Sequence, residues 1–169
     1  MEDLRLVLVQ VAVRHGDRSP VTSLSEDDEH FWSPHMPSPS LLAAAAASSP
    51  LQGELQQLSW SGTGVMGQLT QRGFEQLEQF GRTLREELCG SLIPSDWHPE
   101  LPLIVRSTPF SRTAVSAQAL LAGLYPGRNA ESPIAVAVED GGVMVPDSGS
   151  CNDPQSVARH QVHASGLTD

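Results

Sequence analysis

A short run of residues, Arg14-His15-Gly16-Asp17-Arg18, gathers side chains that could do chemistry together. Arginine stays charged at any relevant pH, and its planar fork of N–H donors matches the oxygens of a phosphate group. The run belongs to a chain with a net charge of -10, in which every cationic side chain other than histidine is an arginine. We therefore expect a local anion site, and phosphate is the anion that such a site would favour.

Between these arginines, His15 has the surroundings of a nucleophile that attacks phosphorus and forms a phosphohistidine. Positive charge nearby opposes protonation of the imidazole and lowers its pKa, so that the ring keeps a free electron pair. The same arginines could hold the phosphoryl group in line and neutralise the charge on its equatorial oxygens. Water would then hydrolyse the phosphohistidine, and this chemistry requires neither a metal ion nor another cofactor.

Buried strands must position these residues. Residues 4–13 are nearly all apolar and rich in valine and leucine, which predicts a strand covered on both faces of a parallel sheet. Residues 101–105 and 134–138 predict two further strands. Gly16 lets the backbone approach a ligand closely, and Pro20 stiffens the loop after it.

Two helices separate the predicted strands. One begins after Thr70, a suitable N-cap, and carries Phe74, Leu77, Gly81, Leu84 and Leu88 on one stripe before it stops at Gly90. The other covers residues 109–123. The order strand, helix, strand, helix, strand predicts an α/β fold with a parallel sheet between layers of helices.

Arg106 follows the second predicted strand, as Arg14 follows the first. Because the strands of a parallel sheet end at one edge, where open α/β sheets bind ligands, these arginines are expected to converge there. We predict His15 as the nucleophile and Arg14, Arg18 and Arg106 as phosphate ligands. Thr108 and Asp17 are weaker candidates, which could contact the ligand or order the arginines. We expect a structural role for Arg112.

Residues 23–64 interrupt the pattern with an acidic run, a stretch rich in proline and serine, and an alanine tract. We expect a partly disordered insertion with a helical turn in the alanines, acting either as a lid over the site or as a variable loop. Residues 1–147 would then form one α/β unit, and residues 148–169 a loop or loose tail.

Composition excludes several classes of function. A sequence pI of about 4.9 argues against non-specific binding to nucleic acid. No segment has the run of about 20 apolar residues that a membrane span needs, and the first residues do not resemble a secretory signal. The sequence leaves the cellular localisation open.

Cys89 and Cys151 could form one disulfide bridge or remain two free thiols.

The residues 14–20, Arg-His-Gly-Asp-Arg-Ser-Pro, resemble the RHGxRxP signature of the histidine acid phosphatases, branch 2 of the histidine phosphatase superfamily. Residues 69–73 resemble the helix start of that family, and residues 106–126 resemble its second arginine segment. Within the family, the stretch Leu-Leu-Ala-Gly-Leu-Tyr-Pro at residues 120–126 is similar to the lysophosphatidic acid phosphatase type.

The resemblance implies an acid phosphatase that hydrolyses phosphate monoesters, with a three-layer sandwich of the phosphoglycerate mutase-like type. Its substrate would be a small phosphorylated molecule, with a lysophospholipid among the candidates. The family also uses a His-Asp pair, whose aspartate protonates the leaving alcohol, and this sequence contains no His-Asp dipeptide. We therefore expect an incomplete amino-terminal portion of the fold.

Three functional hypotheses follow. The first is a phosphatase that works through His15, and the second is a phosphate-binding fragment or pseudoenzyme without turnover. The third, a transferase like phosphoglycerate mutase, shares the Arg-His-Gly start, but the Arg18-Ser19-Pro20 continuation speaks against it.

Overall fold

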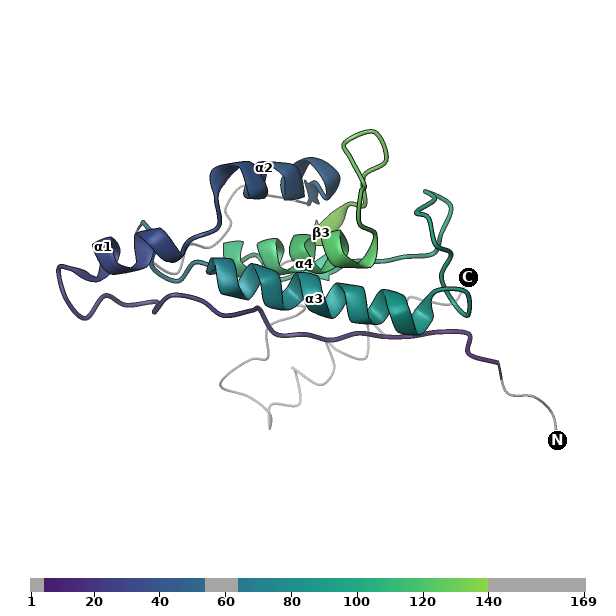
Figure 1. Cartoon of the computed structure of the whole chain (residues 1–169), viewed down its shortest axis with the longest axis horizontal. Coiled ribbons are helices and arrows are strands. Elements are labelled where there is room, and N and C mark those ends of the chain that lie inside the picture. Colours follow the sequence, from purple (N-terminus) through teal and green to yellow (C-terminus); the bar gives the residue numbers. More distant parts are fainter. Residues whose placement is uncertain (1–4, 54–63, 140–169) are drawn as a thin grey trace, which may run out of the picture.

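The structure, a computed structural model, describes residues 5–53 and 64–139. Two long helices lie side by side at its centre, a shorter helix packs against the second of them, and a small sheet lies beside them (Figure 1). In chain order the elements are α1 (Asp28–Trp32), the 3₁₀-helix η1 (Ser33–His35), α2 (Pro39–Ser48), β1 (Leu51–Gln52), α3 (Gln71–Leu88), β2 (Arg106–Ser107), α4 (Ser111–Leu124) and β3 (Val136–Val138).

The sheet is parallel, as the order of strands and helices predicted, and its strands lie in the order β1-β3-β2. Ala137 of β3 is in register with Gln52 on one side and with Arg106 on the other. β3 lies within the predicted third strand. The second predicted strand is displaced, because regular pairing begins at Arg106 and not within residues 101–105. The fold is therefore α/β, with a strand, β1, that the sequence pattern did not reveal.

Both predicted helices are confirmed. The Thr70 side chain caps α3 by accepting a hydrogen bond from the backbone N–H of Gly73, and the helix ends just before Gly90. Phe74, Leu77 and Gly81 form the buried face of α3, while the outer face is polar. Leu121 and Leu124 of α4 join Ile134 and Val136 in a second apolar cluster. The two helices thus supply most of the core on which the loops rest.

Glycine allows α3 and α4 to approach closely. A methyl group on Gly81 would lie 2.0 Å from the carbonyl oxygen of Leu120, and one on Gly123 would lie 1.9 Å from that of Glu78. Both contacts lie where the middle of α3 crosses the end of α4. Arg85 in the last turn of α3 donates to the carbonyl oxygen of Leu124 at the end of α4, and the two helices run in the same direction (Figure 1). Their N-termini therefore lie at the same end of the molecule (Figure 1).

The described part of the predicted insertion, residues 23–53 and Gly64, contains regular helix where the sequence predicted a single helical turn. Its alanine tract forms α2, which packs against α4, instead of a single turn. The Gln118 side chain donates to the carbonyl oxygen of Ser49 at 2.8 Å, and the backbone N–H of Ile134 donates to that of Ser48 at 3.1 Å. The Arg128 guanidinium also donates to Ser48. Alanine's small side chain and these bonds fix the segment on the core.

The prediction of a buried first strand at residues 4–13 is not met in its described part. Residues 5–13 are extended but carry no strand pairing, and Val7 and Leu8 are 78% and 65% exposed. An apolar groove of about 430 Å³ separates this segment from residues 101–105. An apolar segment becomes a buried strand only when another strand pairs with it. Among the described residues, no strand lies in this groove to pair with residues 5–13.

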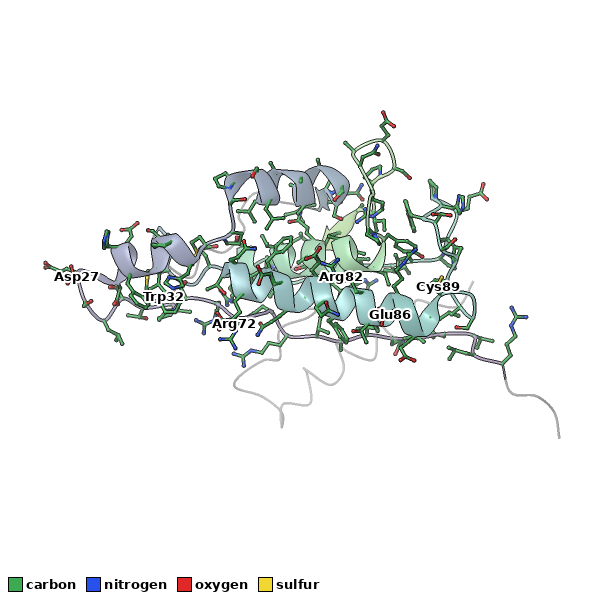
Figure 2. The ribbon with its side chains drawn as sticks, viewed as in Figure 1. Asp27, Trp32, Arg72, Arg82, Glu86 and Cys89 are labelled. Carbon is green, nitrogen blue, oxygen red and sulfur yellow. The ribbon has the colours of Figure 1, made fainter. Side chains whose placement is uncertain are left out.

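The predicted tail at residues 148–169 and Cys151 lie outside the described residues. Cys89 is an exposed thiol at the end of α3 (Figure 2). Within the described part of the chain, no helix has the length and apolar character needed to cross a membrane.

The contact between α3 and α4 yields a stability prediction. Gly81→Ala and Gly123→Ala should each lower the free energy of unfolding by about 1–3 kcal/mol, because the added methyl group meets backbone atoms that cannot rotate away. Thr83→Ala on the exposed face of α3 is the control and should change stability little. Urea unfolding followed by circular dichroism measures all three. A glycine variant as stable as the wild type would contradict the close packing.

Candidate functional site

The loop that carries His15 lies directly on the N-terminus of α3. The Thr70 hydroxyl contacts both Asp17 Oδ2, at 2.7 Å, and the Asp17 carbonyl oxygen, at 3.1 Å. The backbone N–H of Thr70 donates to that same carbonyl at 3.0 Å. A methyl group on Gly16 would lie 2.3 Å from the carbonyl oxygen of Gly73, and one on Gly73 would lie 2.1 Å from that of Asp17. The two backbones therefore touch, which requires glycine at both positions.

The other end of the loop is held by Ser19, which is fully buried. Its hydroxyl donates to the carbonyl oxygen of Val65 at 2.6 Å and accepts from the backbone N–H of Gln68 at 3.1 Å. Its own N–H donates to the Gln68 carbonyl oxygen at 3.0 Å, next to a bridge that pairs Arg18 with Leu69. These bonds fix the backbone of Arg18 on both sides.

Helix α4 also contacts the loop, because the backbone N–H of Gly16 donates to the Ser116 hydroxyl at 3.2 Å. Gly16 therefore lies between the first turns of α3 and the first half of α4. The N-terminus of a helix carries partial positive charge and free N–H groups, which favour an anion. Two parallel helices thus direct this preference toward the same loop.

His15 has a defined tautomer. Its Nδ1 lies 2.8 Å from the carbonyl oxygen of Gly16, and a carbonyl can only accept, so Nδ1 carries the proton and Nε2 keeps its electron pair. Burial is the main cause that lowers the pKa of His15 below 6.5. The charges of Arg112, Arg14 and Arg18 lower this pKa further, while the bond to Gly16 opposes them.

The loop opens onto a shallow hollow of about 490 Å³. The Arg18 Nη1 donates to the Ser19 carbonyl oxygen at 2.7 Å, which orients its guanidinium. Its Nε is buried and has no hydrogen-bond partner among the described residues. Asp17 is the sole carboxylate of the described lining, so positive charge prevails. The lining residues are Arg14, His15, Gly16, Asp17, Arg18, Pro20, Trp32 and Gln76.

The structure brings together Arg14, His15 and Arg18 of the predicted site, but it places Arg106 elsewhere. Arg106 lines the apolar groove, and its Nε lies 3.4 Å from Glu139 Oε1 in a largely exposed ion pair. Thr108 is not among the lining residues of the hollow, and its hydroxyl donates to Thr113 at 2.8 Å. Asp17 lines the hollow and orders the loop.

Arg112, for which the sequence predicts a structural role, acts electrostatically on His15, although it is not among the lining residues of the hollow. Among the arginine charges that lower the pKa of His15, that of Arg112 has the largest effect. Burial and the charges of Arg18 and Arg14 lower the pKa of Arg112 itself. Its Cζ lies 4.4 Å from the centre of the Phe110 ring, which supports the side chain. The feature of the sequence that could have pointed to Arg112 is its position in the first turn of the predicted helix, now α4.

Within residues 5–53 and 64–139, no cluster of at least three His, Cys, Asp or Glu side chains could hold a metal ion. The described hollow combines arginine side chains and nearby helix N-termini, which favour an anion, with an imidazole whose Nδ1 is hydrogen-bonded to a carbonyl oxygen.

Comparison with known proteins agrees with this chemistry. The histidine phosphatase superfamily (branch 2) matches residues 5–166. Bovine lysophosphatidic acid phosphatase type 6 is 28% identical over 180 residues, which cover 97% of this chain and 42% of the bovine protein. Human testicular acid phosphatase is 36% identical over 130 residues, or 77% of this chain and 24% of that protein. Human lysosomal acid phosphatase is 36% identical over 72% of this chain and 22% of its own length. The chain thus spans less than half the length of these relatives.

The electrostatics of the hollow predict how His15 titrates. Its pKa should lie below 6.5, and Arg112→Gln should raise it because a nearby positive charge is removed. Because the folded pKa is lowered, His15 contributes stability that is fully present above pH 6.5 and is lost as the pH falls toward the folded pKa. Histidine NMR signals followed against pH measure the titration. Arg106→Gln is the control, and a larger shift in this variant than in Arg112→Gln would contradict the assignment.

The contact between loop and helix predicts a second effect. Gly73→Ala should weaken binding of inorganic phosphate by at least about tenfold, because the new methyl group would displace Asp17 and the loop. The same change would ordinarily favour a helix, so α3 should persist in circular dichroism. Isothermal titration calorimetry measures the affinity, with Thr83→Ala as the control. Unchanged phosphate binding in Gly73→Ala would show that the loop does not depend on this contact.

Proposed function

Since this chain belongs to the histidine phosphatase superfamily (branch 2), we propose that it binds phosphate monoesters and transfers their phosphoryl group to Nε2 of His15. The observation that carries the proposal is the tautomer of His15. Its Nδ1–H is engaged by the Gly16 carbonyl oxygen, which leaves Nε2 as the unprotonated nitrogen, and His15 lines the same hollow as Arg14 and Arg18. Hydrolysis of the phosphohistidine by water would complete an acid phosphatase reaction.

We propose Arg14, Arg18 and Arg112 as the phosphate ligands. Their guanidinium charges repel one another, and a dianion between them would relieve that repulsion. The charge of Arg112 acts on His15, whereas Arg106 lines the apolar groove and not the hollow, which favours Arg112 over Arg106 in this role. The N-termini of α3 and α4 would add attraction to the bound anion.

In the transfer step, the electron pair of Nε2 forms a bond to phosphorus while the ester P–O bond breaks. The leaving oxygen takes the electron pair of that bond, and the arginines neutralise the equatorial oxygens. An alcohol leaves well only when an acid protonates it, which typically contributes about 10²–10⁴ in rate. This sequence has no His-Asp dipeptide, which in the family supplies that acid. Asp17 is the carboxylate of the described hollow, and it accepts a hydrogen bond from Thr70.

The absence of a His-Asp dipeptide favours a second candidate function, a phosphate-binding chain without turnover. The two candidates differ for esters whose leaving group needs no proton. A nitrophenolate departs unassisted, so phosphoryl transfer to His15 should occur from p-nitrophenyl phosphate even without a general acid.

We further propose that the natural substrate is a small phosphorylated molecule. The names of the relatives include lysophosphatidic acid phosphatase, so a lysophospholipid is one candidate.

For the fold, we propose that the helices and the parallel sheet are part of a three-layer sandwich of the histidine phosphatase type. The apolar groove beside residues 101–105 supports this, because it leaves room for additional sheet.

Mass spectrometry after incubation with p-nitrophenyl phosphate tests the proposal. One phosphoryl group should appear on His15, be lost in acid and be absent from His15→Asn. The exposed His98→Ala variant is the control and should be labelled like the wild type. A phosphoryl group on another residue would overturn the nucleophile assignment. A chain that binds phosphate but is never labelled would be the non-catalytic alternative.

A further inference from the structure

The insertion places an aromatic side chain at the phosphate site. Trp32, the last residue of α1, lines the same hollow as Arg14, His15 and Arg18. Figure 2 shows it on the side of α1 that faces the N-terminal segment. It is half-buried, whereas its neighbour Phe31 is 59% exposed and is not among the lining residues. Trp32 and Pro20 are the apolar side chains of an otherwise polar lining.

The indole ring is held in place by its neighbours. The Phe31 ring meets it edge-on, with centroids 5.3 Å apart and planes at 85°, and the His35 ring lies 5.8 Å away. Phe31 and His35 also stack on each other at 5.2 Å. The His35 Nδ1 lies 2.9 Å from the carbonyl oxygen of Phe31, which locks the turn after α1.

The entry to α1 is fixed as well. Asp28 Oδ2 accepts from the backbone N–H of Leu24 at 2.6 Å and from that of Ser25 at 3.1 Å. These bonds lower the pKa of the Asp28 carboxyl, which therefore stays ionised. The position of Trp32 is thus set by bonds on both sides of a short helix.

We propose that Trp32 forms the wall against which the organic part of the phosphate monoester packs, and that the site prefers a single phosphate attached to an aromatic group. This inference rests on the proposed function. With the phosphate held by arginines, its organic group must leave the hollow past the lining residues. An indole offers a flat, polarisable face that stacks with planar groups.

The charge of the same segment disfavours a second phosphate. Glu26, Asp27, Asp28 and Glu29 precede Phe31 and Trp32 in the sequence with His30 between them, and none of the four is among the lining residues of the hollow. The negative charge of this segment would disfavour a second phosphate on the α1 side of the site, whereas a neutral aromatic group meets no such repulsion. The arginine side of the hollow therefore selects phosphate, and the α1 side selects an uncharged organic group.

Calorimetry with non-hydrolysable ligands tests this preference on the full chain. Phenylphosphonate should bind more tightly than methylphosphonate. Trp32→Ala should weaken phenylphosphonate about tenfold, while changing inorganic phosphate affinity less than about twofold. Trp32→Phe should retain most of the phenylphosphonate affinity, because a stacking face remains. Leu24→Ala, at a position 89% exposed, is the control and should match the wild type.

The outcomes separate the two proposals. If the wild type binds inorganic phosphate but does not distinguish phenylphosphonate from methylphosphonate, Trp32 is not the wall and the phosphate site stands. Equal losses for phosphate and phenylphosphonate in Trp32→Ala would likewise overturn the preference, since the residue would then only support the loop. If the wild type binds neither ligand, the proposed function itself fails.

Discussion

The site depends on one contact between two backbones, that of the His15 loop and that of the first turn of α3. Gly16 and Gly73 leave no room for side chains between them, and Thr70 joins the two segments by capping α3 while bonding to Asp17. Because the same hydroxyl serves the helix and the loop, formation of α3 also positions His15. The ring's own bond to Gly16 then sets its tautomer. The Thr70 cap that begins α3 therefore also helps to place the His15 imidazole.

Once the loop is placed, electrostatics give it a preference. Arg14, Arg18 and Arg112 lie near an imidazole whose pKa is lowered first by burial and then by their charge. In the proposed reaction, the charges that would bind the phosphate would also help to keep Nε2 of His15 unprotonated. The acidic insertion has the opposite charge and contributes Trp32 to the same hollow. In our proposal, the arginine side would contact the phosphate of a ligand and Trp32 its organic group.

Features set by residues close together in the chain could be predicted from the sequence. Strand pairing and packing between distant segments could not. Thr70 as an N-cap, the α3 stripe and the grouping of Arg14, His15 and Arg18 follow from neighbours in the chain. Residues 5–13 are apolar enough for a buried strand, but strand formation needs a partner that the described residues do not supply. Arg106 was predicted because it follows a strand; in the structure it pairs with Glu139, while the charge of Arg112 acts on His15. The alanine tract became α2 because α4 offered a surface to pack against.

The most direct test of this account is an NMR titration of the arginine side-chain Nε–Hε signals with inorganic phosphate. The chain has arginine and no lysine, so these signals report most of its cationic side chains, and single substitutions assign them. The account predicts that Arg14, Arg18 and Arg112 shift together with one affinity, while Arg106 does not move. Shifts at Arg106 without shifts at Arg112, or no shift at Arg14 and Arg18, would contradict it.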